Sequence, residues 1–150
     1  MSGIVGGAGS KSGVIGETEL DYETGEFTAT LIGGTTAGNS PTTTAFYTKI
    51  GNSVTCWIDF YNVNTSSAAG QTVITGLPFS NSADQTCFST QVQTHFWDFD
   101  TAKHYNFIAE KNATQLTSLE FADGAGWAGW DITAGTGKYL RTQITYKCTL

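Results

Sequence analysis

Short stretches in which apolar and polar residues alternate recur along the chain, and they do not follow the 3.6-residue period of a helix. Turn residues, mainly Gly, Asn, Asp and Ser, separate them, and Gly51-Asn52 predicts a two-residue hairpin turn of the type II′ kind. Regularly spaced short strands are typical of an all-β protein, so we expect an antiparallel β-sandwich of jelly-roll-like form. The predicted strands lie at 26–32, 43–50, 53–61, 72–75, 86–99, 104–110, 114–121 and 138–147.

The composition agrees with this fold class. Only 13% of the residues are charged, whereas globular proteins average about 25%. Helices usually expose many Lys and Glu side chains, so a surface of Thr, Ser, Asn and Gly argues for strands. With 150 residues, the chain has the length of one domain.

Residues 1–16 differ from the rest, because Gly and Ser there alternate with isolated apolar residues. The segment is too rich in glycine for a helix and too interrupted for a core strand. We therefore expect an extended arm over residues 1–16 and a β-sandwich domain over residues 17–150. Ordering such an arm costs about 1–2 kcal/mol per residue, which a partner subunit could offset by pairing with its backbone. The anchoring side chains would be Ile4, Val5, Val14 and Ile15; the alternative is that the arm packs on its own domain.

Charge and hydropathy exclude several functions. The net charge is −6 and the seven Lys and Arg residues are scattered, so we expect no nucleic-acid binding. No apolar run approaches the ~20 residues of a membrane helix, and we expect no membrane insertion. The first residues lack the charged start and apolar core of a signal peptide. The sequence thus predicts a protein made in a cytoplasm and not exported by a signal.

The candidate catalytic and metal-binding residues form weak patterns. Asp98 and Asp100 would share one face if the strand reached them, with Phe99 pointing inward, but a solvated strand end explains them equally well. His95, Asp98 and His104 could ligate a metal, yet a separation of three places His95 and Asp98 on opposite faces of a regular strand. No GxSxG nucleophile motif or phosphate-binding loop occurs. We predict no enzymatic activity, no metal site and no cofactor.

Two tryptophans, Trp127 and Trp130, lie in the loop-like stretch DGAGWAGWD. Exposed Trp side chains can stack on sugar rings, so both are candidate contacts for a glycan or a partner. The alternative is that they cover the open end of the sandwich or lie in a subunit contact.

The chain has three cysteines, Cys56, Cys87 and Cys148. An odd number without CxxC spacing fits neither a disulfide scaffold nor a zinc site. Each lies in a strand-like run, so we expect reduced, buried thiols; the alternative is that one pair is bridged where the assembled particle meets an oxidising environment.

Several elements in order resemble a domain of bacteriophage virion proteins, especially of tail fibres and fibre-like proteins of marine phages. The pattern opens with TGEFT at 24–28, continues with YTKIGN at 47–52 and a hydrophobic strand at 54–60, and ends with GLPF at 76–79. In this pattern we expect Pro78 to end a strand and Phe79 to fold back into the core.

The resemblance implies a structural subunit of a virion, made in the host cytoplasm and displayed on the particle as a capsid decoration, head fibre or short tail-fibre component. Its partners would be other virion proteins, held through the arm, and copies of itself, with a trimer favoured. The alternative function is a receptor- or glycan-binding adhesion module of a tail fibre, whose partner is a host-surface glycan. The family offers no catalytic residues to carry over.

Overall fold

The computed structural model describes residues 21–83, 87–124 and 126–149, with the backbone alone for residues 87–91. These ranges contain strands and no helix, and therefore none that could cross a membrane. The predicted anchoring arm, residues 1–16 with Ile4, Val5, Val14 and Ile15, lies outside the described residues. The eight strands are β1 (Tyr22–Gly33), β2 (Thr42–Ile50), β3 (Ser53–Val63), β4 (Thr72–Thr75), β5 (Cys87–His95), β6 (His104–Ala109), β7 (Gln115–Phe121) and β8 (Lys138–Lys147).

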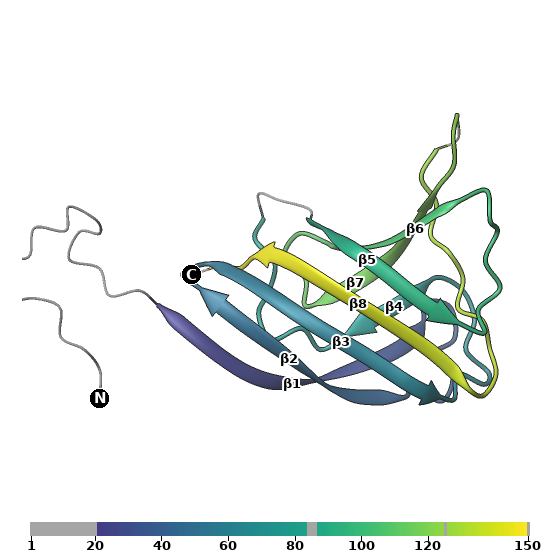
Figure 1. The fold of residues 1–150 in the computed structure, drawn as a ribbon, viewed down its shortest axis with the longest axis horizontal. Coiled ribbons are helices and arrows are strands. Elements are labelled where there is room, and N and C mark those ends of the chain that lie inside the picture. The colour runs from purple at the N-terminus through teal and green to yellow at the C-terminus, as the bar shows by residue number, and fades with distance from the viewer. Residues whose placement is uncertain (1–20, 84–86, 125, 150) are drawn as a thin grey trace, which may run out of the picture.

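The strands form one closed antiparallel barrel in the order β1-β2-β3-β8-β5-β6-β7-β4, and β4 pairs with β1 to complete the ring. In Figure 1, β1, β2, β3, β8 and β5 form the near wall, and β4, β6 and β7 lie behind them. The prediction of an all-β, antiparallel fold is therefore confirmed, and the pairing of β1 with β4 joins the two layers at one edge.

Strand limits follow the alternation of the sequence closely. β4 and β8 have the predicted bounds, whereas β5 ends at His95 and not at residue 99. The reason lies in the next residue, Phe96, whose φ of 62° is left-handed and cannot continue a strand. Asp98 and Asp100 consequently follow the strand in a loop.

The β2–β3 hairpin has the predicted turn. Ile50 is paired with Ser53, and Gly51 between them has a φ of 59°. A positive φ at the first central residue is what a type II′ turn requires, and glycine adopts it without a steric penalty.

The core lies inside the barrel and is formed by every second residue of the long strands. On β3 these are Val54, Cys56, Ile58 and Phe60, each 2% exposed or less. The GLPF segment closes one part of the core: the Phe79 ring packs edge-on against the Tyr47 ring at 5.4 Å, and the Phe79 carbonyl accepts a hydrogen bond from the Tyr146 hydroxyl. Phe79 thus folds back into the core, as the sequence predicts.

Cys56 and Cys148 are free and buried, in agreement with the prediction, while the side chain of Cys87 lies outside the described residues. Burial raises the pKa of Cys56 to about 12, although a hydrogen bond with Tyr146 opposes the shift. The thiolate is the reactive form, which slows labelling of Cys56, and both sulfur atoms lie in buried residues. We therefore expect native protein to label slowly with iodoacetamide at Cys56 and Cys148 at pH 8 and rapidly in denaturant. Mass spectrometry of labelled peptides measures both rates, and rapid labelling of the native protein at these two positions would contradict the structure.

Candidate functional site

The outer surface of β3 and β8 carries large aromatic side chains. The inward residues of β3 are apolar, so the residues between them, Trp57, Asp59 and Tyr61, face outward. The Trp57 side chain is 43% exposed and the Tyr61 side chain 67%. Aromatic rings are costly to leave in water, and their presence here marks this face as a candidate interaction surface.

Strand register arranges these residues in rows across the wall. Trp57 is paired with Phe46 of β2 on one side and with Gln143 of β8 on the other. In the next row, Arg141 of β8 is paired with Asp59 of β3 and Gln93 of β5. Directly opposed side chains in antiparallel strands lie about 4.5–5.5 Å apart at Cβ, so each row forms a continuous strip.

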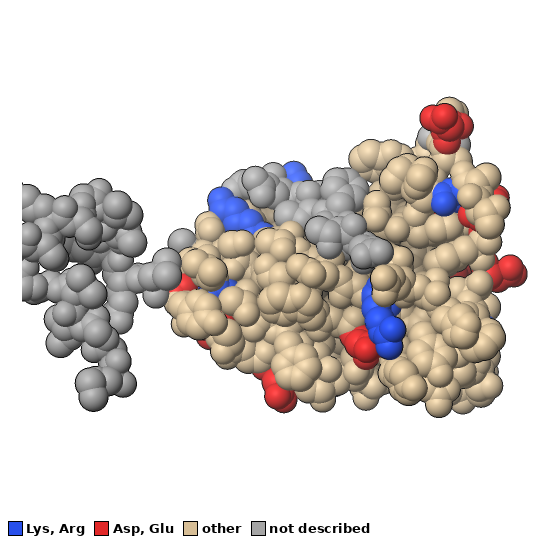
Figure 2. All heavy atoms as spheres, in the orientation of Figure 1, with Lys and Arg blue, Asp and Glu red and all other residues tan. Residues whose placement is uncertain are grey.

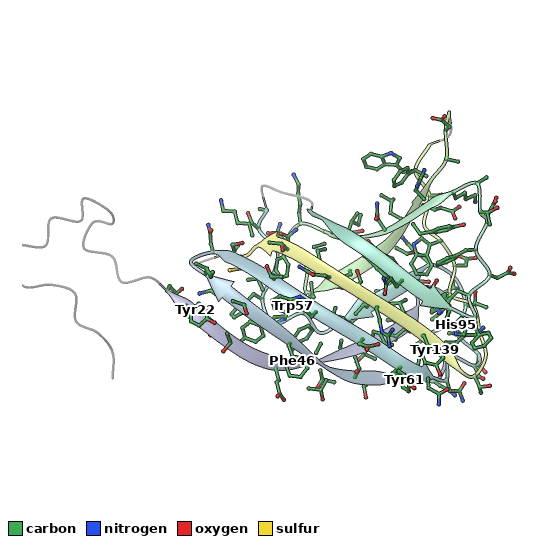
Figure 3. All side chains as sticks on the ribbon, in the orientation of Figure 1. Tyr22, Phe46, Trp57, Tyr61, His95 and Tyr139 are labelled. Carbon is green, nitrogen blue, oxygen red and sulfur yellow. The ribbon has the colours of Figure 1, made fainter. Side chains whose placement is uncertain are left out.

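A third row lies nearer the end of the barrel. The rings of Tyr61 and Tyr139 meet edge to face at 4.9 Å, and the ring of His95 lies 5.6 Å from that of Tyr139. Figure 3 shows the labelled side chains of Phe46, Trp57, Tyr61, His95 and Tyr139 on the wall formed by β2, β3, β8 and β5.

Two adjoining hollows follow these rows, and together they are called the outer groove below. The first has a volume of about 320 Å³ and is lined by Thr44, Phe46, Trp57, Ile58, Asp59, Gln93, Arg141, Thr142 and Gln143. The second has a volume of about 830 Å³ and is lined by Tyr61, Val92, Gln93, Thr94, His95, Phe99, Lys103, His104, Tyr105, Tyr139 and Arg141. Gln93 and Arg141 line both hollows, so the two lie next to each other.

The second hollow lies between β5 and β6. These strands pair at Cys87–Ala109 and Phe88–Ile108, near the start of β5. The hollow is lined by the later part of β5, the start of β6 and the loop that joins them. Phe99 from that loop stacks on Tyr105 at 4.0 Å, which forms one wall.

An ion pair lies at the junction of the two hollows. Arg141 Nε donates to Asp59 Oδ1 at 3.0 Å, and the two side chains are 49% and 52% exposed. A pair this exposed stabilises a fold by only about 0.2–1 kcal/mol. Its greater effect is to hold the guanidinium in place, where planar N–H groups suit hydroxyl and carboxylate oxygens.

A second ion pair borders the larger hollow. Lys103 Nζ donates to Glu120 Oε1 at 2.6 Å. This hydrogen bond raises the pKa of Lys103, so the ammonium group remains charged at neutral pH. The loop between β5 and β6 is thereby fixed to β7.

The acidic residues considered for catalysis have identifiable local roles. Asp98 and Asp100 are exposed and flank Phe99, which packs against the core although it lies in a loop and not in the strand that the sequence predicted there. Asp100 Oδ1 accepts the Ala102 N–H at 2.9 Å, an Asx turn that reverses the chain. Within the described ranges, no group of three His, Cys, Asp or Glu side chains is placed to hold a metal ion.

The structure separates the two loop tryptophans. Trp127 is 71% exposed, whereas Trp130 is 3% exposed and packs against the core. The prediction that Trp130 could contact a glycan is corrected, because its ring is surrounded by Trp97, Phe99, Tyr105 and Phe107. Trp130 instead fits the alternative reading, that of a residue that covers the core. Trp127 is not among the residues that line the outer groove.

The outer groove is not among the sites that the sequence predicts, although the alternation in β3 carries a usable signal. In SVTCWIDFY at 53–61 the apolar residues Val54, Cys56, Ile58 and Phe60 set the inward phase. Trp57 and Tyr61 then face outward. The solvent side of such a strand usually carries polar residues, so two large aromatic residues there are a departure from the usual alternation.

The protein is thus a small antiparallel barrel that carries a groove lined by aromatic and charged side chains on its outer wall. No family model matches the sequence, and no curated protein matches it. One solved structure with a similar fold is the crystal structure of Dettilon tailspike protein (gp208), with a TM-score of 0.69 and 16% sequence identity. The match covers 85% of this chain and 24% of that chain, so this protein corresponds to about a quarter of the tailspike's length.

Proposed function

We propose that this protein is an adhesion module of a bacteriophage tail, a virion component that contacts the host surface. The likeness of its barrel to part of a tailspike protein, over 85% of this chain, is the observation that carries the proposal. The resemblance to phage fibre proteins that we infer from TGEFT, YTKIGN and GLPF is consistent with this proposal. The outer groove supplies a surface through which such a module could bind.

A structural role without catalysis accords with the positions of the acidic residues. Asp98 and Asp100 lie in a turn, where the Asp100 carboxylate accepts a backbone hydrogen bond. The module would join the particle through residues 1–16 and act as a homo-oligomer, with a trimer favoured by the resemblance to fibre proteins.

Purified protein is expected to bind host cells and to reduce adsorption of the phage that carries it. Flow cytometry of fluorescently labelled protein on host and non-host strains measures binding, and free-phage counts measure competition. Gold-labelled antibodies against the protein should mark the tails of purified particles. Labelling confined to the head would instead favour a capsid decoration or head fibre, and a lack of binding to host cells would refute the adhesion role.

A further inference from the structure

The outer groove has two chemically different halves. The first hollow is lined by the aromatic rings of Phe46 and Trp57 and by one carboxylate, that of Asp59. The second is lined by Lys103, His95 and His104, and the residues that line it include neither Asp nor Glu. Arg141 lies where the halves meet.

The aromatic half suits the apolar face of a sugar ring. The Phe46 and Trp57 side chains are 53% and 43% exposed, and they belong to directly paired residues of β2 and β3. Side-chain amides and the Asp59 carboxylate adjoin the rings, so hydroxyl groups at the sugar's edge would find acceptors and donors. Figure 2 shows charged side chains sparsely distributed on this face, which favours an uncharged ring there.

The other half suits an anionic group. The whole chain carries a net charge of −6, yet this hollow is lined by an ammonium, a guanidinium and both histidines of the chain. Imidazole donates at least one N–H in either protonation state. The carboxylate partners of Lys103 and Arg141 fix these two cations, and the Glu120 side chain is only 17% exposed. A carboxylate that enters from solvent would therefore meet donors held in position.

From this chemical difference between the two halves we propose that the outer groove binds an acidic oligosaccharide. A neutral sugar ring would lie on Phe46 and Trp57. A carboxylate-bearing sugar would lie near Arg141, Lys103 and the two histidines. Both volumes lie in the range of about 300–1,000 Å³ typical of small-molecule sites, so the groove has room for more than one ring. This inference rests on the proposed adhesion role and names the ligand class and the site.

The probe is surface polysaccharide extracted from the cells that the protein binds, used both in native form and after chemical reduction of its carboxylates to alcohols. Biolayer interferometry with the full chain measures Kd for each form. Carboxylate reduction should weaken binding at least about tenfold, because it removes charge-assisted hydrogen bonds. Equal affinity for the two forms would overturn the acidic-ligand assignment.

Variants locate the site. Trp57→Ala should weaken binding of both forms about tenfold, whereas Arg141→Gln should weaken binding of the native form selectively and so reduce the discrimination between the two forms. The matched controls are Trp127→Ala, which removes an exposed Trp outside the groove, and Lys111→Gln, which removes one exposed positive charge. Both controls should bind as the unaltered protein does, and all four variants should remain folded, with melting temperatures within about 4 °C of that of the unaltered protein.

The outcomes also separate this inference from the proposed function. If the protein adheres to cells but not to their polysaccharide, or if Trp127→Ala is the damaging change, the groove assignment fails while the adhesion role stands. If light scattering shows that Trp57→Ala dissociates an oligomer, the groove is a subunit interface and the assignment fails as well. If the protein does not adhere to cells, both proposals fail.

Discussion

Replacement of Trp130 by alanine is expected to lower the free energy of unfolding by about 3–5 kcal/mol, the usual cost of deleting a buried Trp ring. Trp130 meets the rings of Trp97 at 5.4 Å and of Phe99 and Phe107 at 5.1 Å each. Its indole N–H donates to the Asn106 carbonyl at 3.2 Å. The substitution thus removes edge-to-face ring contacts and a hydrogen bond, and leaves a cavity beside β6.

Trp127→Ala is the matched control, since the same side chain is deleted three residues earlier in the same loop. Because Trp127 is 71% exposed, its removal should change stability by no more than about 0.5 kcal/mol. Urea denaturation of both variants gives the two free energies of unfolding. If the two variants lost similar amounts of unfolding free energy, or if Trp127→Ala lost more, the loop would pack differently from the structure described above.

This contrast illustrates which features the sequence could predict. The alternation in KYLRTQITYK predicts β8 with its observed bounds, because the inward phase of a strand is a local property. The turn at Gly51-Asn52 is equally local. In DGAGWAGWD, by contrast, no periodicity assigns either Trp to the inside, and the burial of Trp130 depends on β6 and the β5–β6 loop, which lie elsewhere in the sequence.

The outer groove could not be predicted from the sequence either, because it depends on the order of the strands in the barrel. Trp57 and Arg141 are 84 residues apart in the sequence, and they line the same hollow only because β3 pairs with β8. Alternation indicates that both face outward, but a pairing between strands this distant in sequence is set by the closure of the whole barrel. The sequence therefore predicted strands and turns well, and could not predict which outward side chains gather into one site.

The second large effect is expected for Gly76→Ala, which tests the turn of the GLPF segment. Gly76 has a φ of 94°, and a Cβ added there would lie 2.3 Å from the Thr28 carbonyl oxygen of β1. The position is fixed, because the N–H groups of Gly76 and Leu77 both donate to the Thr114 carbonyl. Alanine would incur about 1–2 kcal/mol for the left-handed backbone and a further ~1–3 kcal/mol for displacing β1 from the turn. We expect a total loss of about 2–5 kcal/mol.

Gly51→Ala separates the two contributions. Gly51 also has a positive φ, 59°, but an added Cβ would meet nothing within 4 Å, so only the backbone cost of about 1–2 kcal/mol applies. For a domain of this size, each kcal/mol lowers Tm by about 2–4 °C, and differential scanning calorimetry resolves the two variants. The excess loss in Gly76→Ala measures how closely the turn after β4 approaches β1. Equal losses would mean that this approach is looser than described, and that the glycine of GLPF serves its backbone conformation alone.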